Sequence, residues 1–215
     1  MLKDTPAFQV FQSSVSSSKF GVGFYIAGNK ICGANNNVGQ CGDHEIKNSS
    51  FDFNASGGIL AIRTDLCLFN DFFIGNTIAG IRLMGSNMIS DFNYVFATQP
   101  DSSDLWGDGV VVMPWTCPSD VRLKHLNTFD SYRAGVSNFG SIVKLDKSMM
   151  KCSAFDIDNE SVAPGTFGPA IPPTTLDPST KDEGGNSCGC PVASEACFAV
   201  SSGGLAPPPP VAASN

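Results

Sequence analysis

The sequence predicts an all-β chain of stacked coils, and three observations lead to this prediction. Two stretches align without a gap over 22 residues, Asp65–Ser86 and Asp120–Ser141, and both place a glycine and a β-branched residue fifteen residues after the leading Asp. Short segments alternate apolar and polar residues, as half-buried strands do. No window shows a sustained helical period. Repeats of this length, built from short strands and polar turns, predict a parallel β-helix.

The coils are marked by an anchor, a glycine followed by an apolar residue. The anchors are Gly23-Phe24, Gly58-Ile59, Gly80-Ile81, Gly109-Val110 and Gly135-Val136, with Ala154-Phe155 as a degenerate sixth copy. The steps between them are 35, 22, 29, 26 and 19 residues, so the longer coils carry inserted loops. Two insertions, Ile31–Asp43 and Thr98–Asp108, are rich in turn residues. About six coils are expected, and insertions in stacked repeats often form the binding face.

Within a coil, alternate side chains of each strand are expected to fill the interior. The alternating pairs are Ile59/Ala61, Ile81/Leu83, Val110/Val112, Val121/Leu123 and Val143/Leu145. Phe72, Phe73 and Phe129 precede the anchors by six to eight residues, which suits an interior aromatic stack. Four asparagines in or beside turns are expected to form amide ladders between coils: Asn70, Asn93, Asn127 and Asn138.

These residues carry a resemblance to a known family. The segment from Asp108 to Gly140, DGVVVMPWTCPSDVRLKHLNTFDSYRAGVSNFG, resembles the coils of the right-handed parallel β-helix, or pectin-lyase-like, superfamily. The resemblance covers about residues 8–161 and implies a right-handed parallel β-helix. The superfamily includes polysaccharide lyases, glycoside hydrolases, epimerases, tailspikes and adhesins, so the fold alone does not select a function.

Composition changes sharply after the coils. Ten of the 14 prolines follow Ser161, which predicts coils at 1–161, a Pro/Gly-rich linker with a cysteine-rich segment at 162–202, and a disordered tail at 203–215. The first fifteen residues contain neither a signal peptide nor a segment that could cap the first coil. A mature form or a fragment lacking N-terminal coils is therefore expected.

Charge and cysteine content favour an exported protein. The net charge is −7 and no basic cluster occurs, so nucleic acid is not an expected partner, and no run reaches the length of a membrane span. Eight cysteines in 215 residues indicate disulfides and an extracellular or cell-surface location. Cys32 and Cys41 flank a loop and form the most plausible local bridge. Cys188, Cys190 and Cys197 could bind zinc, but they lack a fourth ligand nearby, and no metal or other cofactor is expected.

The densest patch of polar and aromatic residues comes from two adjacent coils, between Trp106 and Arg133. The resemblance implies acid–base chemistry on acidic sugars at an outer sheet, and its candidate catalytic residues are Asp108, His125, Asp130 and Arg133. Candidate substrate-binding residues are Trp106, Trp115, Lys124 and Tyr132. Structural roles are the alternatives: Asp108 as a turn cap, Arg133 as its salt-bridge partner and His125 as a solvated strand residue.

Two functional hypotheses remain open. The paired-Asp, Gly-His-Gly and Arg-x-Lys motifs of polygalacturonase-like hydrolases are absent, as are the Trp-x-Asp-His and Arg-x-Pro-x-x-Arg motifs of pectate lyases. The first hypothesis is therefore a non-catalytic β-helix that presents an elongated outer sheet for binding, with polysaccharide or a cell-surface glycan as partner. The second is a polysaccharide lyase, hydrolase or epimerase that acts around Trp106–Arg133.

Overall fold

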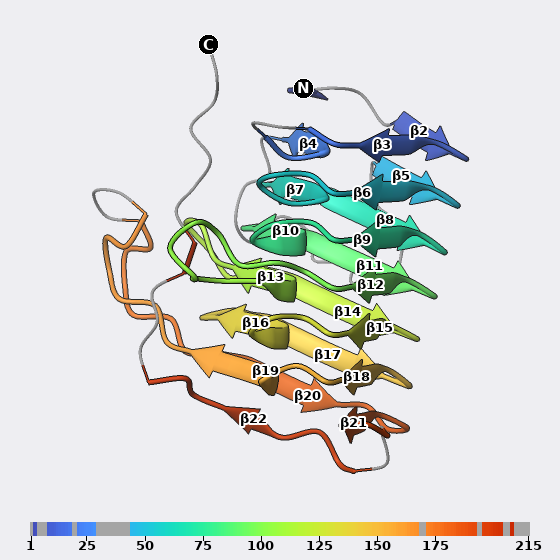
Figure 1. The fold of residues 1–215 in the computed structure, drawn as a ribbon. Coiled ribbons are helices and arrows are strands. Elements are labelled where there is room, and N and C mark those ends of the chain that lie inside the picture. The colour runs from blue at the N-terminus through green and yellow to red at the C-terminus, as the bar shows by residue number, and fades with distance from the viewer. Residues whose placement is uncertain are drawn as a thin grey trace.

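Three parallel β-sheets wind along the chain, and successive coils stack from β2 at one end to β22 at the other (Figure 1). The computed structural model describes residues 2–3, 8–18, 21–28, 44–167, 171–192, 195–203 and 207–208. In these residues, sheet A has eight strands and sheets B and C have seven each. Neighbouring strands within each sheet pair in parallel. The architecture fits the predicted right-handed parallel β-helix, so the fold class is confirmed.

Each coil contributes one strand to each sheet, in the order B, C, A. Sheet A contains β1 (Leu2–Lys3), β4 (Phe24–Ala27), β7 (Ile59–Ile62), β10 (Ala79–Met84), β13 (Asp108–Met113), β16 (Ala134–Phe139), β19 (Phe155–Glu160) and β22 (Ala199–Val200). Sheet B contains β2 (Phe8–Phe11), β5 (His44–Lys47), β8 (Asp65–Phe69), β11 (Asn87–Asp91), β14 (Asp120–Lys124), β17 (Ile142–Asp146) and β20 (Ser179–Asp182). Sheet C contains β3 (Ser14–Ser16), β6 (Ser50–Asp52), β9 (Phe72–Ile74), β12 (Tyr94–Phe96), β15 (Asn127–Phe129), β18 (Met149–Lys151) and β21 (Ser187–Gly189).

The first five predicted anchors lie at equivalent positions of successive coils. Their apolar residues pair in one column along sheet A, which is partly buried at Phe24 and fully buried at Ile59, Ile81, Val110 and Val136. The anchor position requires glycine because neighbouring coils approach closely there. A Cβ on Gly80 would lie 2.5 Å from Val95 Cγ1 and 2.9 Å from the carbonyl oxygen of Gly109. Glycine therefore fixes where each coil enters sheet A.

The sixth anchor lies two residues later than the sequence predicts. Val136 pairs with Ile157, whereas Phe155 pairs with Ala134, which precedes the anchor glycine. Ile157 is buried and joins the interior cluster, so the sixth copy of the anchor is Asp156-Ile157 and not Ala154-Phe155. No glycine marks the corner before β19, so the position of the sixth anchor could not be read from the motif.

The corner between sheets B and C repeats one turn. Its first residue has a positive φ and faces outward, as in Asn48 (φ 52°) and Asn70 (φ 56°). The next residue faces inward and accepts a hydrogen bond from the coil before it: Asp71 Oδ1 accepts from Ser49 N (2.8 Å), and Asn93 Oδ1 accepts from Asp71 N (2.8 Å). These bonds satisfy the buried backbone amides of Ser49 and Asp71. The predicted contacts between coils are present for both Asn93 and Asn70, but Asn93 faces inward as expected, whereas Asn70 donates to Asn48 Oδ1 on the outer side.

The two other asparagines of the predicted ladder bond within or beside strands. Asn127 Nδ2 donates to the carbonyl oxygen of His125 two residues earlier. Asn138 is buried in β16 and donates to Thr180 Oγ1 of the last coil at 3.1 Å.

Only one of the three phenylalanines predicted for the interior lies there. Phe73 is fully buried and stacks on Phe51 of the previous coil, with ring centroids 5.2 Å apart. Phe72 is 39 % exposed because neighbouring residues of a strand face opposite sides of the sheet. Phe129 pairs with Phe96 in sheet C and is likewise on the outer side. The interior assignment of Phe72 and Phe129 is therefore wrong.

The sheets continue beyond Ser161, the predicted end of the coils. Strands β20, β21 and β22 extend all three sheets through the stretch expected to be a linker. Two disulfides hold this last coil, Cys152–Cys190 to the coil before it and Cys188–Cys197 within it. Of the predicted tail at 203–215, residues 203 and 207–208 are described.

Candidate functional site

The outer face of sheet A, where the predicted polar cluster falls, is covered by loops. Trp106 comes from the loop before β13 and is only 6 % exposed. Trp115 and Phe167 pack over the same face, with ring centroids 6.2 Å apart. The loop that carries Phe167 is closed by reciprocal backbone hydrogen bonds between Val162 and Leu176. This face is therefore a second apolar core and not an open binding surface.

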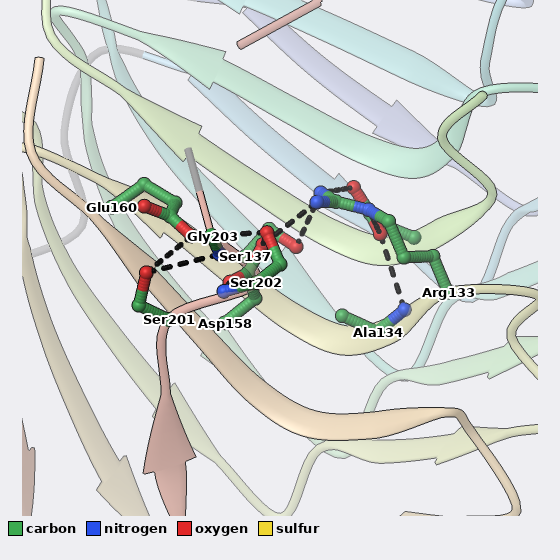
Figure 2. A network of polar contacts seen from close by, with 9 residues as sticks. Arg133, Ala134, Ser137, Asp158, Glu160, Ser201, Ser202 and Gly203 are labelled. Atoms are coloured by element: carbon green, nitrogen blue, oxygen red, sulfur yellow. Dashed lines mark hydrogen bonds and ion pairs between the residues drawn. The ribbon is translucent and has the colours of Figure 1, made fainter. Parts of the chain in front are cut away.

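The Arg133 guanidinium carbon lies 5.5 Å from the centroid of the Trp106 ring. Two buried carboxylates hold the guanidinium, one of them Asp158 (Figure 2). Nε and Nη2 donate to the two oxygens of Asp108, at 2.8 and 2.5 Å, and Nη1 donates to Asp158 Oδ2 at 2.7 Å. Nη2 also donates to Ser137 Oγ at 3.0 Å. Both carboxylates are fully buried. One side chain thus links β13, β16 and β19 across three successive coils.

Electrostatics at this cluster follow from its burial. Burial raises the pKa of Asp108 above its ordinary value, although the hydrogen bonds and charge of Arg133 oppose the shift. Burial also raises the pKa of Asp158, again against the charge of Arg133. For Arg133 itself, burial acts to lower the pKa, but its hydrogen bonds and charge interactions with the two carboxylates raise it. The guanidinium therefore stays charged, and its contacts are those of an internal ion network.

A C-terminal strap, residues 201–203, closes the cluster from outside (Figure 2). Ser202 donates from its backbone N–H to Asp158 Oδ1 at 3.0 Å and from Oγ to Glu160 Oε1 at 2.9 Å. Ser201 Oγ donates to the same Glu160 oxygen at 2.9 Å. Asp158 and Glu160 of β19 are therefore both bound by the strap rather than directed at solvent.

The other predicted residues near this corner do not join the cluster. Asp130 is exposed at the turn after β15, with φ 52°. Tyr132 is 53 % exposed, and its backbone N–H donates to the carbonyl oxygen of Thr98. Trp115 follows β13 at the opposite end of that strand.

Lys124 and His125 lie at a different corner, between sheets B and C. His125 Nδ1 is 2.8 Å from Asp91 Oδ1, and its ring stacks on Phe92 with centroids 4.3 Å apart. Lys124 Nζ is 3.9 Å from Asp91 Oδ2. Strand β15 separates this corner from Arg133. Of the eight predicted site residues, the structure brings together only Trp106, Asp108 and Arg133.

Sheet C presents the opposite situation, an outer face with an aromatic ladder. The ladder consists of Phe72, Tyr94, Phe96 and Phe129. Phe72 stacks on Tyr94 with centroids 5.0 Å apart and planes 8° apart, and Phe96 stacks on Phe129 at 5.0 Å and 9°. Tyr94 and Phe96 lie side by side in one strand with parallel planes. The connections from sheet B to sheet C are short turns, so no long insertion borders the face at that edge.

The geometry of the ladder decides what it can contact. Because the rings face one another along the helix axis, their edges are directed at solvent. Ring edges carry the positive part of the aromatic quadrupole and suit oxygen acceptors. At one end, Phe72 pairs with Ser50, a small side chain that leaves a ring face uncovered by another ring. Ile74 and Met149 widen the apolar surface. An exposed apolar patch of this kind typically marks a binding surface.

The outward position of Phe129 and the carboxylates of β19 were both missed, although each had a signal in the sequence. In the 22-residue alignment Phe73 corresponds to Thr128, so Phe129 aligns with the outward Ile74 rather than with Phe73. The alternation around Ile157 places Asp158 and Glu160 outward, and the two-residue error in the sixth anchor does not change this, because it leaves each side chain on the same face of the strand. The serines of the strap had no such signal, because they contact the cluster from more than 40 residues away along the chain.

The structure also tests the predictions made for the cysteines and for the membrane. The predicted Cys32–Cys41 bridge lies outside the described residues. Cys188, Cys190 and Cys197 are all in disulfides, so their sulfurs are not thiolates that could bind zinc. The described residues contain no cluster of metal-ligating side chains. Within that same part of the chain, no helix has the length and apolarity needed to cross a bilayer.

Comparison of the chain with protein-family models, curated proteins and solved structures found no match. The fold therefore rests on the coil register and sheet topology described above, and the likeness to the pectin-lyase-like superfamily remains one of sequence pattern.

Proposed function

We propose that this protein is a non-catalytic β-helix of the cell exterior that binds an uncharged polysaccharide along the outer face of sheet C. The observation that carries the proposal is the outward-facing aromatic ladder of Phe72, Tyr94, Phe96 and Phe129, in which Phe72 is exposed and the other three rings are partly buried. It forms an apolar strip across three coils, flanked by polar residues such as Ser50 and Lys151.

Three properties support a polysaccharide as the occupant. An extended polymer matches a straight strip better than a compact ligand does, because equivalent positions repeat from coil to coil. Ring edges favour the oxygen-rich surface of a sugar chain. The net charge of −7 makes an uncharged polymer a better fit than a strongly anionic one. The disulfides of the last coil fit an oxidising location outside the cell.

Catalysis around Trp106–Arg133 has weaker support. A general acid or base must reach its substrate directly or through one water. Asp108 and Asp158 are fully buried, and Arg133 donates hydrogen bonds to both of them and to Ser137. The contacts favour the structural alternative for these residues.

A glycan-array screen of the oxidised protein tests the proposal. We expect binding to one class of uncharged polysaccharide, and a loss of affinity of about tenfold or more, equivalent to about 1.4 kcal/mol, when Tyr94 and Phe96 are both replaced by alanine. The matched control is Phe198→Ala, because Phe198 is 63 % exposed but lies outside sheet C.

Two outcomes contradict the proposal. One is the absence of binding to any polysaccharide. The other is binding that survives the Tyr94/Phe96 double replacement but disappears with Trp106→Ala, which would return the site to sheet A.

A further inference from the structure

The sequence contains three Asn-x-Ser sequons, the acceptor pattern for N-linked glycans. They begin at Asn48, Asn54 and Asn159. A sequon is used only if its amide nitrogen can project from the surface, since the attached glycan is large and polar. The coil register places the three asparagines in very different environments.

Asn54 cannot carry a glycan in the folded protein. Its side chain is fully buried at the corner after sheet C. Nδ2 donates to Asn76 Oδ1 at 3.0 Å and to the carbonyl oxygen of Val15 at 3.3 Å, so the amide joins three successive coils. Substitution on this nitrogen would remove both bonds and force a sugar into the interior.

Asn159 is also engaged, in the sixth coil. Its position in β19 pairs with Asn138 of β16, whose side chain is fully buried. Asn159 Oδ1 accepts a hydrogen bond from Thr180 Oγ1 at 2.8 Å. The side chain therefore faces the last coil rather than solvent.

Asn48 has the opposite environment. It is exposed at the outward corner between sheets B and C, with φ 52°. Its Oδ1 accepts a hydrogen bond from Asn70 Nδ2, which orients the amide at the surface. Ser49 faces inward and is buried, whereas Ser50 begins β6 on the outer side. The outward turn therefore presents the asparagine of this sequon at the surface.

We propose that Asn48 is a site of N-linked glycosylation and that Asn54 and Asn159 are not. In the reaction, Asn48 Nδ2 attacks the anomeric carbon of an oligosaccharide carried on a lipid diphosphate by an oligosaccharyltransferase. A carbon–nitrogen bond forms, the bond between the anomeric carbon and the diphosphate oxygen breaks, and the lipid diphosphate leaves. The amide gives one proton to a base. The inference rests on the extracellular location within the proposed function and not on polysaccharide binding.

The test is secretion from a eukaryotic host, followed by intact-mass analysis and peptide mapping with and without an amidase that releases N-glycans. We expect one glycan per chain, located on Asn48 and lost in both Asn48→Gln and Ser50→Ala. The matched positive control is Gln12→Asn, which creates a sequon with Ser13 and Ser14 at the equivalent exposed turn, where φ is 48°. It is expected to add a second glycan.

Unmodified wild-type protein alongside a modified Gln12→Asn variant would overturn the inference, and so would a glycan mapped to Asn54 or Asn159. Secreted wild-type protein and Gln12→Asn that both lack a glycan would overturn it as well. Polysaccharide binding is read separately on the array with the Asn48→Gln variant, so a failure there is distinguishable from a failure of glycosylation.

Discussion

Replacing Arg133 by methionine tests whether the buried charges on sheet A stabilise the fold. The change leaves Asp108 and Asp158 buried without their shared cation, while the apolar side chain keeps most of the packing under Trp106. Removing one partner of a buried ion pair costs about 3–5 kcal/mol. Arg133→Lys keeps the charge but loses the bidentate fork, so we expect a smaller loss of about 1.5–3 kcal/mol.

Denaturation with guanidinium chloride, with disulfides intact and tryptophan fluorescence as the signal, measures these losses. The control is Arg122→Met: Arg122 contacts Glu183 at 2.8 Å on the outer face of sheet B, and its side chain is 38 % exposed. An exposed pair of this kind contributes about 0–1 kcal/mol. If Arg133→Met costs no more than Arg122→Met, the network is not structural and the reasoning is refuted.

Three further predictions concern the coils themselves. Phe73→Ala should lower the free energy of unfolding by about 3–5 kcal/mol, and the neighbouring Phe72→Ala by no more than about 1.5 kcal/mol; equal losses would contradict the assigned faces. Gly80→Ala should cost about 1–3 kcal/mol by the same measurement, because its Cβ would press on the backbone of the next coil, and an unchanged midpoint would contradict that close approach. Burial raises the pKa of Asp71 to about 7, so the folded state holds a proton that the unfolded chain releases near pH 4. The resulting stability is fully present below about pH 4 and is lost as the pH rises through about 7. The free energy of unfolding of Asp71→Asn should therefore rise relative to that of the wild type as the pH is raised from 4 to 8. A difference between the two free energies that does not change with pH would contradict the raised pKa.

The fold was predictable from the sequence because its strongest signals are local. An anchor glycine is required wherever two coils approach closely, and the residue after it must fill the interior. The predicted anchor was wrong only at Asp156-Ile157. No glycine marks that position, and Phe155 and Ile157 have the same place in the alternation, so either could follow the anchor. The last coil was missed because its strands are short and polar, and disulfides hold it in place of a large apolar face.

The candidate site was only partly predictable, because exposure depends on long-range contacts. The pairing of Arg133 with Asp108 followed from their shared position before consecutive anchors. The residues adjacent to Asp108 and Arg133 in the sequence did not indicate that the pair would be buried. The burial comes from the loop that carries Trp106 and from the strap at residues 201–203. Conversely, the sequence predicts Phe72 and Phe129 in the interior because both lie six to eight residues before an anchor glycine, a spacing that does not distinguish neighbouring residues on opposite faces of a strand. A strict alignment of the repeats would have put both on the outer face.

The most direct test of the central claim is an NMR measurement of contacts between the bound polysaccharide and protein labelled with ¹³C in its aromatic rings. If the outer face of sheet C is the binding surface, sugar protons will show intermolecular nuclear Overhauser effects to the rings of Phe72, Tyr94, Phe96 and Phe129. Effects to the indole rings of Trp106 and Trp115, with none to the sheet C rings, would place the ligand on sheet A and contradict the account.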